Sequence, residues 1–320
     1  MIGIVGTGAF GTALAIALAR EGRSVRLWGR DAADLAAMRE SRVNTRRLPD
    51  GRLPPSVDLR SDLADLTACD TILLAIPMQS LRAVLTGPGA ALDGKALVAC
   101  CKGVDLSSLT GPAMVVAGAC PSATVALLTG PSFAADIARG LPTALTLACA
   151  DPQAGEALQH QLSTPTLRLY RTEDVLGAEL GGALKNVMAI AAGVVIGAGL
   201  GDSARAALMT RGYAEMARLA IHLGAKAETL AGLSGFGDLV LTCTSAQSRN
   251  FRFGQALGAG TVFDPSVTVE GAATAHAVSE LARRQGLDLP ITTMVSALVQ
   301  GRVTLQQAVT ELLSRPLKQE

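Results

Sequence analysis

The residues Gly6 to Gly11 (GTGAFG) follow a short run rich in β-branched residues, Ile2 to Val5, and open an apolar helical stretch. In a G-x-G-x-x-G turn between strand and helix, the first glycine permits the tight turn and the second lets a pyrophosphate approach the backbone. The third allows close helix packing, and the first helical turn offers unpaired N–H groups to an anion. The sequence therefore predicts a dinucleotide site formed by Gly6, Gly8, Ala9, Phe10 and Gly11.

The residues after the second predicted strand bear on the choice of dinucleotide. NAD-selective sites usually carry an acidic side chain there, which binds the ribose hydroxyls. Here the strand is followed by Gly29, Arg30 and Asp31. A guanidinium can pair with a 2′-phosphate, so Arg30 favours NADP or the use of both cofactors. Two alternatives stay open: Asp31 turns toward a ribose, or Arg30 is only a solvated turn residue.

Lys185 lies in a helical segment between Leu180 and Ile190 that is apolar except for the following Asn186. Burial disfavours the charged form of an ammonium group and pulls its pKa down toward neutrality. A pKa in that range is useful for a group that donates and accepts a proton in catalysis. The alternative is a lysine that extends along the apolar surface to solvent. We favour the acid/base role because Asn186 follows directly and the pair belongs to a longer motif given below.

Asp238 and Thr242 are four residues apart, so on a helix they share one face and can address the same substrate or Lys185. A carboxylate beside an ammonium group would hold the lysine in place and tune its proton affinity. The alternative for Asp238 is an N-cap that follows the turn Gly235 to Gly237.

Ser248, Arg249 and Asn250 precede a helix that we expect to begin at Phe251. The triplet combines N–H groups with a guanidinium, and both suit a phosphate group. Arg249 could additionally reach a bound cofactor. The alternative is a capping serine followed by a solvated arginine.

Further segments stand in a fixed order along the chain: Gly6 to Leu14 (GTGAFGTAL), Leu27 to Asp31 (LWGRD), Lys102-Gly103, Gly130 to Ala134 (GPSFA), Gly140 to Ala144 (GLPTA), Ala183 to Ala192 (ALKNVMAIAA), Gly199 to Asp202, Ala206 to Gly212 (AALMTRG), Gly232 to Arg252 (GLSGFGDLVLTCTSAQSRNFR) and Val269 to Gly271. With these motifs the chain resembles the bacterial-type NAD(P)-dependent glycerol-3-phosphate dehydrogenases over almost its full length. The resemblance implies interconversion of dihydroxyacetone phosphate and sn-glycerol 3-phosphate in a cleft between two domains, with Lys185 as general acid/base. It also implies supply of glycerol 3-phosphate for phospholipid synthesis, and a homodimer.

The resemblance assigns roles to further residues. Lys102 would contact the substrate and the nicotinamide at the carboxyl edge of the sheet, although Cys101 replaces the usual serine before it. Glu270 matches a glutamate that contacts the cofactor, and a helix-initiating carboxylate is the alternative. The resemblance also assigns Ala134 to the cofactor. The residues that it assigns to the substrate are Gly130, Ser132, Asn186, Asp238, Thr242, Ser248, Arg249 and Asn250.

These residues need a scaffold, and the chain of 320 residues is long enough for two domains. Up to Thr172, β-branched runs alternate with helical segments, which is typical of a parallel sheet covered on both faces. Residues 44–55, with three prolines and three arginines, read as a surface loop. After Thr172 the strand signal fades and Ala/Leu-rich helical spacing follows. We therefore expect an α/β fold, with a Rossmann-type doubly wound sheet over 1–172 and an all-helical domain over 173–320.

The composition excludes some classes of protein. Lys and Arg (28) nearly balance Asp and Glu (27), which argues against nucleic-acid or polybasic membrane binding. The apolar stretch Val187 to Leu200 is too short for a membrane span and reads as a buried helix. The chain starts directly on a strand, so we expect a cytoplasmic protein. Neither the three histidines nor the six cysteines have the spacing of a metal site, and we expect no metal.

Two rival functions remain at this stage. One is a β-hydroxyacid or ketopantoate-type dehydrogenase of the same architecture, which would also need a lysine beside an asparagine. The segments 235–242 and 248–250 instead suit a phosphorylated substrate. The other rival is a non-catalytic NADP-binding sensor, against which the presence of both Lys185 and Asp238 argues.

Overall fold

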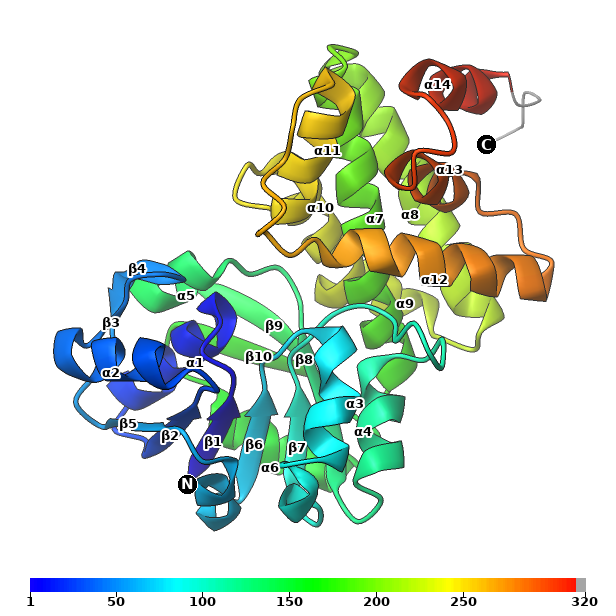
Figure 1. The fold of residues 1–320 in the computed structure, drawn as a ribbon. Coiled ribbons are helices and arrows are strands. Elements are labelled where there is room, and N and C mark those ends of the chain that lie inside the picture. The colour runs from blue at the N-terminus through cyan, green and yellow to red at the C-terminus, as the bar shows by residue number, and fades with distance from the viewer. Residues whose placement is uncertain (315–320) are drawn as a thin grey trace.

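The computed structural model describes residues 1–314 and divides into a half built on a sheet and a half built of helices (Figure 1). The eight-stranded sheet has the order β10-β9-β8-β7-β6-β1-β2-β5. Its strands are β1 (Ile2–Val5), β2 (Val25–Trp28), β5 (Val57–Arg60), β6 (Thr71–Leu74), β7 (Ala96–Ala99), β8 (Thr124–Thr129), β9 (Thr143–Cys149) and β10 (Leu167–Thr172). This arrangement confirms the predicted Rossmann-type fold.

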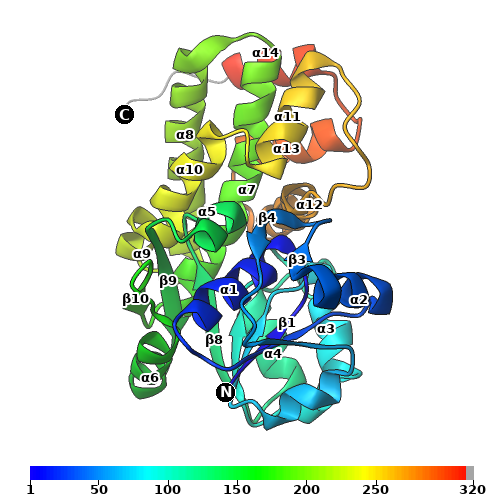
Figure 2. The same ribbon diagram turned by 90° about the vertical axis from the view of Figure 1, so that its left-hand side faces the viewer.

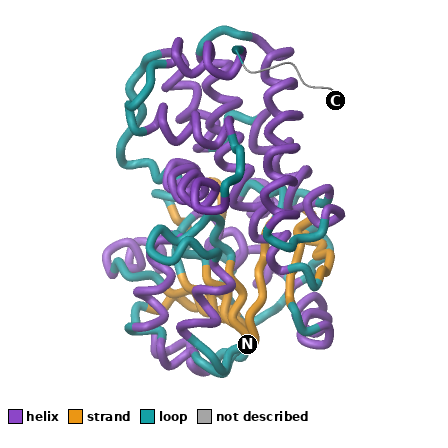
Figure 3. The backbone as a smooth tube through the Cα atoms, turned by 90° about the vertical axis from the view of Figure 1, so that its right-hand side faces the viewer, coloured by secondary structure: helices purple, strands orange, loops and turns teal. Residues whose placement is uncertain are grey.

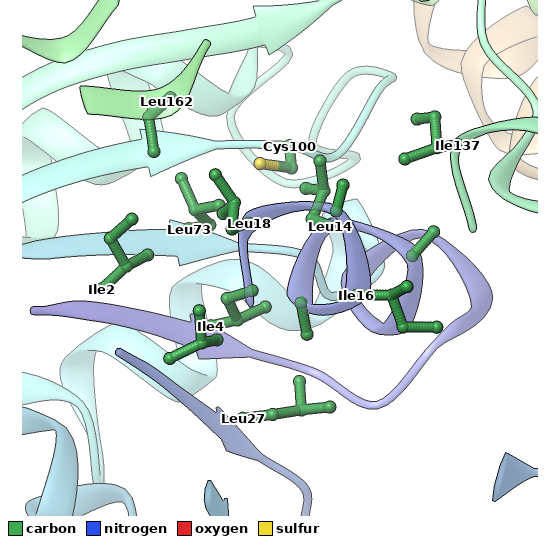
Figure 4. Packing of buried hydrophobic residues seen from close by; sticks show 14 of the residues in the cluster. Ile2, Ile4, Leu14, Ile16, Leu18, Leu27, Leu73, Cys100, Ile137 and Leu162 are labelled. Carbon is green, nitrogen blue, oxygen red and sulfur yellow. The ribbon is translucent and has the colours of Figure 1, made fainter. Parts of the chain in front are cut away.

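Helices cover both faces of the sheet. One face packs against α1 (Ala9–Arg20), α2 (Ala32–Ser41), α5 (Ala134–Arg139) and α6 (Pro152–Leu162). The other packs against α3 (Met78–Thr86) and α4 (Pro112–Ala119). Figure 4 shows Leu18 of α1 beside Leu73 of the sheet and Leu14 of α1 beside Cys100, in a core of aliphatic side chains. Short 3-10 turns at Leu63–Ala68 and Ala90–Leu92 complete this half.

Two details of this half differ from the sequence-based expectation. β8 and β9 pair antiparallel, so the sheet is mixed rather than parallel throughout. Strand direction depends on how the connections run in space, and the hydrophobic pattern does not encode it. The predicted surface loop at 44–55 is wrong in part: it contains the hairpin of β3 (Val43–Asn44) and β4 (Leu48–Arg52). Buried Leu48 and Leu53 anchor this hairpin, a weak signal among so many prolines and arginines.

All regular elements that the structure describes after Thr172 are helical, and Figure 3 shows the strands confined to the other half. The helices are α7 (Val175–Gly197), α8 (Gly201–His222), α9 (Ala227–Ala231), α10 (Asp238–Thr244), α11 (Arg249–Ala259), α12 (Glu270–Gln285), α13 (Pro290–Val299) and α14 (Leu305–Leu313), with a π turn at Leu233–Gly237. α7 runs through the middle of this half, and its lower end meets the sheet half (Figure 2).

α7 is long and apolar enough to cross a membrane, but 89% of its most apolar window is buried inside the molecule. The expectation of a buried helix in this region is therefore confirmed. Its closest neighbour is α11, and glycines set the approach of the two helices. A Cβ at Gly254 would overlap the carbonyl oxygen of Ile190, and one at Gly193 would overlap that of Phe251. Backbone-to-backbone packing of this kind fixes α11, and the residues at its start, against α7.

Candidate active site

Lys185 projects from the buried stretch of α7, and its side chain is 9% exposed. Its Nζ donates to Oδ1 of Asp238 at 2.9 Å and to Oγ1 of Thr242 at 2.6 Å. Thr242 in turn donates to the same Asp238 oxygen at 3.2 Å. The predicted helix face of Asp238 and Thr242 is thus present and meets Lys185, and the lysine does not extend to solvent.

Asp238 owes its position to close packing around the π turn that precedes α10. A Cβ at Gly181 of α7 would lie 2.7 Å from the carbonyl oxygen of Ser234 in that turn. Gly237 takes the N-cap position of α10, and Asp238 is the first helical residue, 1% exposed. The alternative that Asp238 serves as an N-cap is therefore wrong, because its carboxylate is directed to the lysines instead.

Lys102 reaches the same carboxylate from the sheet half. It follows β7, and its Nζ donates to Oδ2 of Asp238 at 2.5 Å and to the carbonyl oxygen of Gly130 at 3.1 Å. Gly182 lets α7 pack closely against β8 beside Lys102, since a Cβ there would lie 2.5 Å from Oγ1 of Thr129. The two oxygens of one carboxylate thus bind one lysine from each half of the molecule.

Burial and neighbouring charges determine the proton affinities in this cluster. Burial lowers the pKa of Lys185 to about 8; Asp238 opposes this shift, and the like charge of Lys102 adds to it. Burial alone would raise the pKa of Asp238, but the two lysines offset it and hold that pKa below its usual value. Around neutral pH, Asp238 is therefore a carboxylate and Lys185 is an ammonium group. Because its pKa is about 8, Lys185 loses its proton when the pH rises only slightly above neutral.

The turn after β8 holds three further predicted residues on the same edge of the sheet, because β7 and β8 are parallel neighbours. Gly130 has a φ of +134°, a backbone conformation that residues with a side chain rarely adopt. Its carbonyl oxygen accepts from Lys102. The hydroxyl of Ser132 donates to the same carbonyl oxygen of Gly130 at 3.5 Å. Ala134 begins α5. The structure thus brings this turn to Lys102.

The residues at the start of α11 divide into three environments. Ser248 is buried and caps the helix by accepting from the N–H of Phe251 at 3.2 Å, so α11 begins at Arg249, earlier than expected. Arg249 is exposed. Asn250 donates to Oδ1 of Asn186 at 2.9 Å, which places it beside the neighbour of Lys185. The capping alternative holds for Ser248, and the exposure of Arg249 also fits the solvated arginine of that alternative, whereas Asn250 lies beside Asn186.

Glu270 begins α12 close to this group. The Oδ1 atom of Asn250 accepts from the N–H of Gly271 at 3.0 Å and so holds the helix start. Burial raises the pKa of Glu270, and the charges of Arg249 and Lys102 partly offset this rise. Glu270 therefore lies within the electrostatic reach of both cations.

The glycine-rich turn has the shape that a dinucleotide pyrophosphate requires. Gly6 has a φ of +117°, and a Cβ there would lie 2.5 Å from the carbonyl oxygen of Ala75. A Cβ at Gly11 would overlap the carbonyl oxygen of Gly6. Among residues 1–314, no side chain caps the start of α1, so its first N–H groups, including those of Ala9 and Phe10, can face an anion. The residues present fit the group.

Arg30 lies exposed between β2 and α2. Asp31 caps α2, because its Oδ1 accepts from the N–H groups of Ala33 and Asp34 at 3.0 and 3.1 Å. This cap occupies one oxygen of the Asp31 carboxylate. The exposure of Arg30 fits both a contact with a 2′-phosphate and a solvated turn residue, so the choice of cofactor at this position stays a prediction.

Among the buried polar residues that sequence reasoning missed are Asn44 and Glu179. Oε1 of Glu179, on α7, accepts from the N–H of Ala113 at the start of α4 at 2.5 Å. Burial raises the pKa of Glu179 to about 7. A lone glutamate on an apolar helix was the available signal, of the same kind that pointed to Lys185. Asn44 lies in the segment predicted to be a surface loop.

The chain matches known proteins over its whole length. Two family models fit, described as the N-terminus (residues 1–155) and the C-terminus (residues 174–310) of NAD-dependent glycerol-3-phosphate dehydrogenase. A protein of Cereibacter sphaeroides named glycerol-3-phosphate dehydrogenase [NAD(P)+] is 66% identical over 320 residues, all of both chains. One of that name from Roseobacter denitrificans is 60% identical, over all of this chain and 99% of its own. The crystal structure of glycerol-3-phosphate dehydrogenase from Coxiella burnetii superposes with a TM-score of 0.93 at 39% identity, covering 98% of each chain.

Proposed function

Because the chain belongs to the NAD-dependent glycerol-3-phosphate dehydrogenases, we propose that Lys185, held by Asp238 and Thr242, is its proton-transfer group. The enzyme interconverts dihydroxyacetone phosphate and sn-glycerol 3-phosphate with NAD or NADP. Reduction of the ketone turns the carbonyl oxygen into an alkoxide, which needs a proton donor and electrostatic support. The cofactor, when bound, supplies the hydride.

One observation carries the proposal: the side chain of Lys185 makes two hydrogen bonds in a buried site. An ammonium group has three N–H donors, and Asp238 and Thr242 use two of them. The third is left for the substrate oxygen. Two fixed acceptors also restrict rotation about the last bond of the lysine, so the remaining N–H keeps one direction. This is the pre-organisation that a general acid requires.

The lowered pKa of Lys185, about 8, suits a reaction that runs in both directions. In ketone reduction the ammonium form donates its proton to the developing alkoxide. In alcohol oxidation the neutral amine accepts the proton of the hydroxyl. Both forms are accessible near neutral pH, so the same side chain serves as acid and as base.

The remaining assignments concern the substrate's phosphate and the wider site. We assign the phosphate to the start of α11, where Ser248 supplies the cap and Arg249 and Asn250 present a guanidinium and an amide. Lys102, Gly130 and Ser132 would line the substrate from the sheet side, as would Asn186 from α7. Lys102 would also face the cofactor, together with Ala134, Arg249 and Glu270.

Four broader statements are part of the same proposal. The boundary between the cofactor-binding and substrate-binding domains lies between residues 172 and 173. The protein is cytoplasmic, it forms a homodimer, and its product supplies phospholipid synthesis. Size-exclusion chromatography with light scattering tests the dimer, and cell fractionation tests the location.

The experiment follows NADPH and NADH oxidation with dihydroxyacetone phosphate in the parent and in Lys185→Ala. We expect kcat to fall by roughly 10² to 10⁴-fold, the usual contribution of a positioned acid/base group. Binding of NADPH, measured by fluorescence titration, should stay within about twofold, because the change does not touch the glycine-rich turn. A variant with full turnover would remove Lys185 from the mechanism. A parent that binds cofactor without turnover would support the sensor alternative.

A further inference from the structure

Asn44 is a buried polar residue outside the catalytic cluster, 4% exposed, at the end of β3. Its Nδ2 donates to the carbonyl oxygen of Thr7 at 2.8 Å and to Oγ1 of Thr12 at 2.9 Å. Thr7 lies inside the glycine-rich turn, and Thr12 lies in the first turns of α1. A side chain from a distant hairpin thus holds both parts of the anion-binding motif.

The direction of this amide is fixed by its surroundings. Oδ1 of Asn44 accepts from the N–H of Arg47 at 3.1 Å, and a backbone N–H can only donate. The oxygen must therefore face Arg47, and the NH₂ group must face Thr7 and Thr12. Both of its N–H groups are used in that orientation.

The bond to Thr7 has a consequence for the neighbouring N–H. A peptide unit is planar and trans, so the carbonyl of Thr7 and the N–H of Gly8 point in opposite directions. When Asn44 draws the Thr7 carbonyl toward the hairpin, the Gly8 N–H turns to the other side, away from the hairpin. Apart from the chain neighbours of Gly8, a Cβ at this position would meet only the carbonyl oxygen of Ala75 within the described chain, at 3.9 Å, so the backbone here is not closely covered.

The hairpin that carries Asn44 is itself firmly attached. Leu48 and Leu53 are buried, and the N–H of Leu53 donates to the carbonyl oxygen of Arg42 at 2.8 Å. The guanidinium of Arg42 donates to the carbonyl oxygens of Pro54 and Val57. Asn44 therefore acts from a rigid support.

We propose that Asn44 is a positioning residue for the cofactor, which holds the Thr7–Gly8 peptide so that the Gly8 N–H faces the pyrophosphate. The inference rests on the use of NAD or NADP by this chain. The pyrophosphate is common to both cofactors, so Asn44 contributes equally to the binding of each. Arg30 differs from it in this respect, because a 2′-phosphate is present in NADP alone.

The test is Asn44→Asp, measured by fluorescence titration with NADPH and with NADH. Aspartate keeps the size and the acceptor for the Arg47 N–H, but it sets a carboxylate against the Thr7 carbonyl oxygen. We expect both dissociation constants to rise by a similar factor, roughly tenfold or more, in keeping with the cost of an unpaired buried group. At saturating cofactor, kcat and the KM for dihydroxyacetone phosphate should stay within about twofold. Hydrogen exchange without cofactor should accelerate over residues 6–12.

Asp50→Asn, an exposed position on the same hairpin, is the matched control and should bind both cofactors as the parent does. Thr12→Val is a second variant, for the case that Asn44→Asp fails to fold. It removes one acceptor of Asn44, so both dissociation constants should rise by the same factor, smaller than the factor expected for Asn44→Asp. Parental affinities in these variants overturn the inference, and so does a loss confined to NADPH. A parent that binds neither cofactor contradicts the proposed function instead.

Discussion

Nζ of Lys185 lies 2.9 Å from Oδ1 of Asp238, in a site where the carboxylate is 1% exposed. Two buried opposite charges at this distance stabilise each other, and the loss of one leaves the other without compensation. The pKa of Lys185 therefore depends directly on its partner. Lys102 binds the second carboxylate oxygen, so it competes for the same negative charge.

The first prediction concerns the pH dependence of ketone reduction. Reduction needs the ammonium form of Lys185, so kcat/KM should fall as the pH rises through about 8. Asp238 raises the pKa of Lys185, and Asp238→Asn should therefore shift this fall to lower pH, by about one unit or more. Lys102 lowers that pKa, so Lys102→Met should shift the fall to higher pH. Rate profiles between pH 6 and about 10 measure both. Shifts in the same direction would contradict the assignment.

The second prediction concerns cofactor choice. In Arg30→Ala the 2′-phosphate of NADPH loses a charge-assisted hydrogen bond, which contributes about 1.5 to 3 kcal/mol. We expect the KM for NADPH to rise roughly tenfold or more and the KM for NADH to change less than about twofold. Arg302→Ala, at an exposed position of the helical half, is the control. An equal rise in the KM for NADPH and for NADH would mean that Arg30 contacts a part of the molecule that the two cofactors share, and not the 2′-phosphate.

Much of the fold and part of the site were predictable because their signals are local. The glycine-rich turn follows its strand directly, and Asp238 and Thr242 share one helical turn. The contacts that complete the site join distant residues: Lys102 and Asp238 are 136 positions apart, and Asn44 and Thr7 are 37. Nothing in the sequence near Asn44 indicates its partners. The resemblance to a known family, rather than spacing, pointed to Lys102.

The third prediction concerns stability and pH. Folding raises the pKa of the Glu179 carboxyl from 4.5 to about 7, so the folded state binds the proton more tightly. The contribution of the Glu179 proton to the free energy of unfolding is complete below pH 4.5 and is lost as the pH rises to about 7. This difference corresponds to roughly 3 kcal/mol. Glu179→Gln keeps an acceptor for the Ala113 N–H and cannot titrate, so it should be relatively more stable at pH 8.

Urea unfolding at pH 5 and pH 8 measures this effect as a difference between variant and parent, which cancels the contribution of other groups such as buried Glu215. Glu156→Gln is the control, because Glu156 is exposed. The control should retain the parental pH dependence. An unchanged dependence in Glu179→Gln would show that the carboxyl is already ionised at pH 5 in the folded protein.

The last prediction concerns the contact between α7 and α11. In Gly254→Ala the new methyl group overlaps the carbonyl oxygen of Ile190, and backbone atoms of two helices must separate to admit it. We expect a loss of about 3 kcal/mol in the free energy of unfolding. The displaced α11 would also draw Asn250 away from Asn186, so the KM for dihydroxyacetone phosphate should rise more than that for NADPH.

Gly118→Ala is the matched control: Gly118 is exposed on α4, and a Cβ there meets no atom within 4 Å in the described chain. That change should stabilise the protein by about 0.5 to 1 kcal/mol through helix propensity. Similar effects of the two substitutions, in unfolding and in KM, would mean that the glycine at 254 is not required by the helix contact.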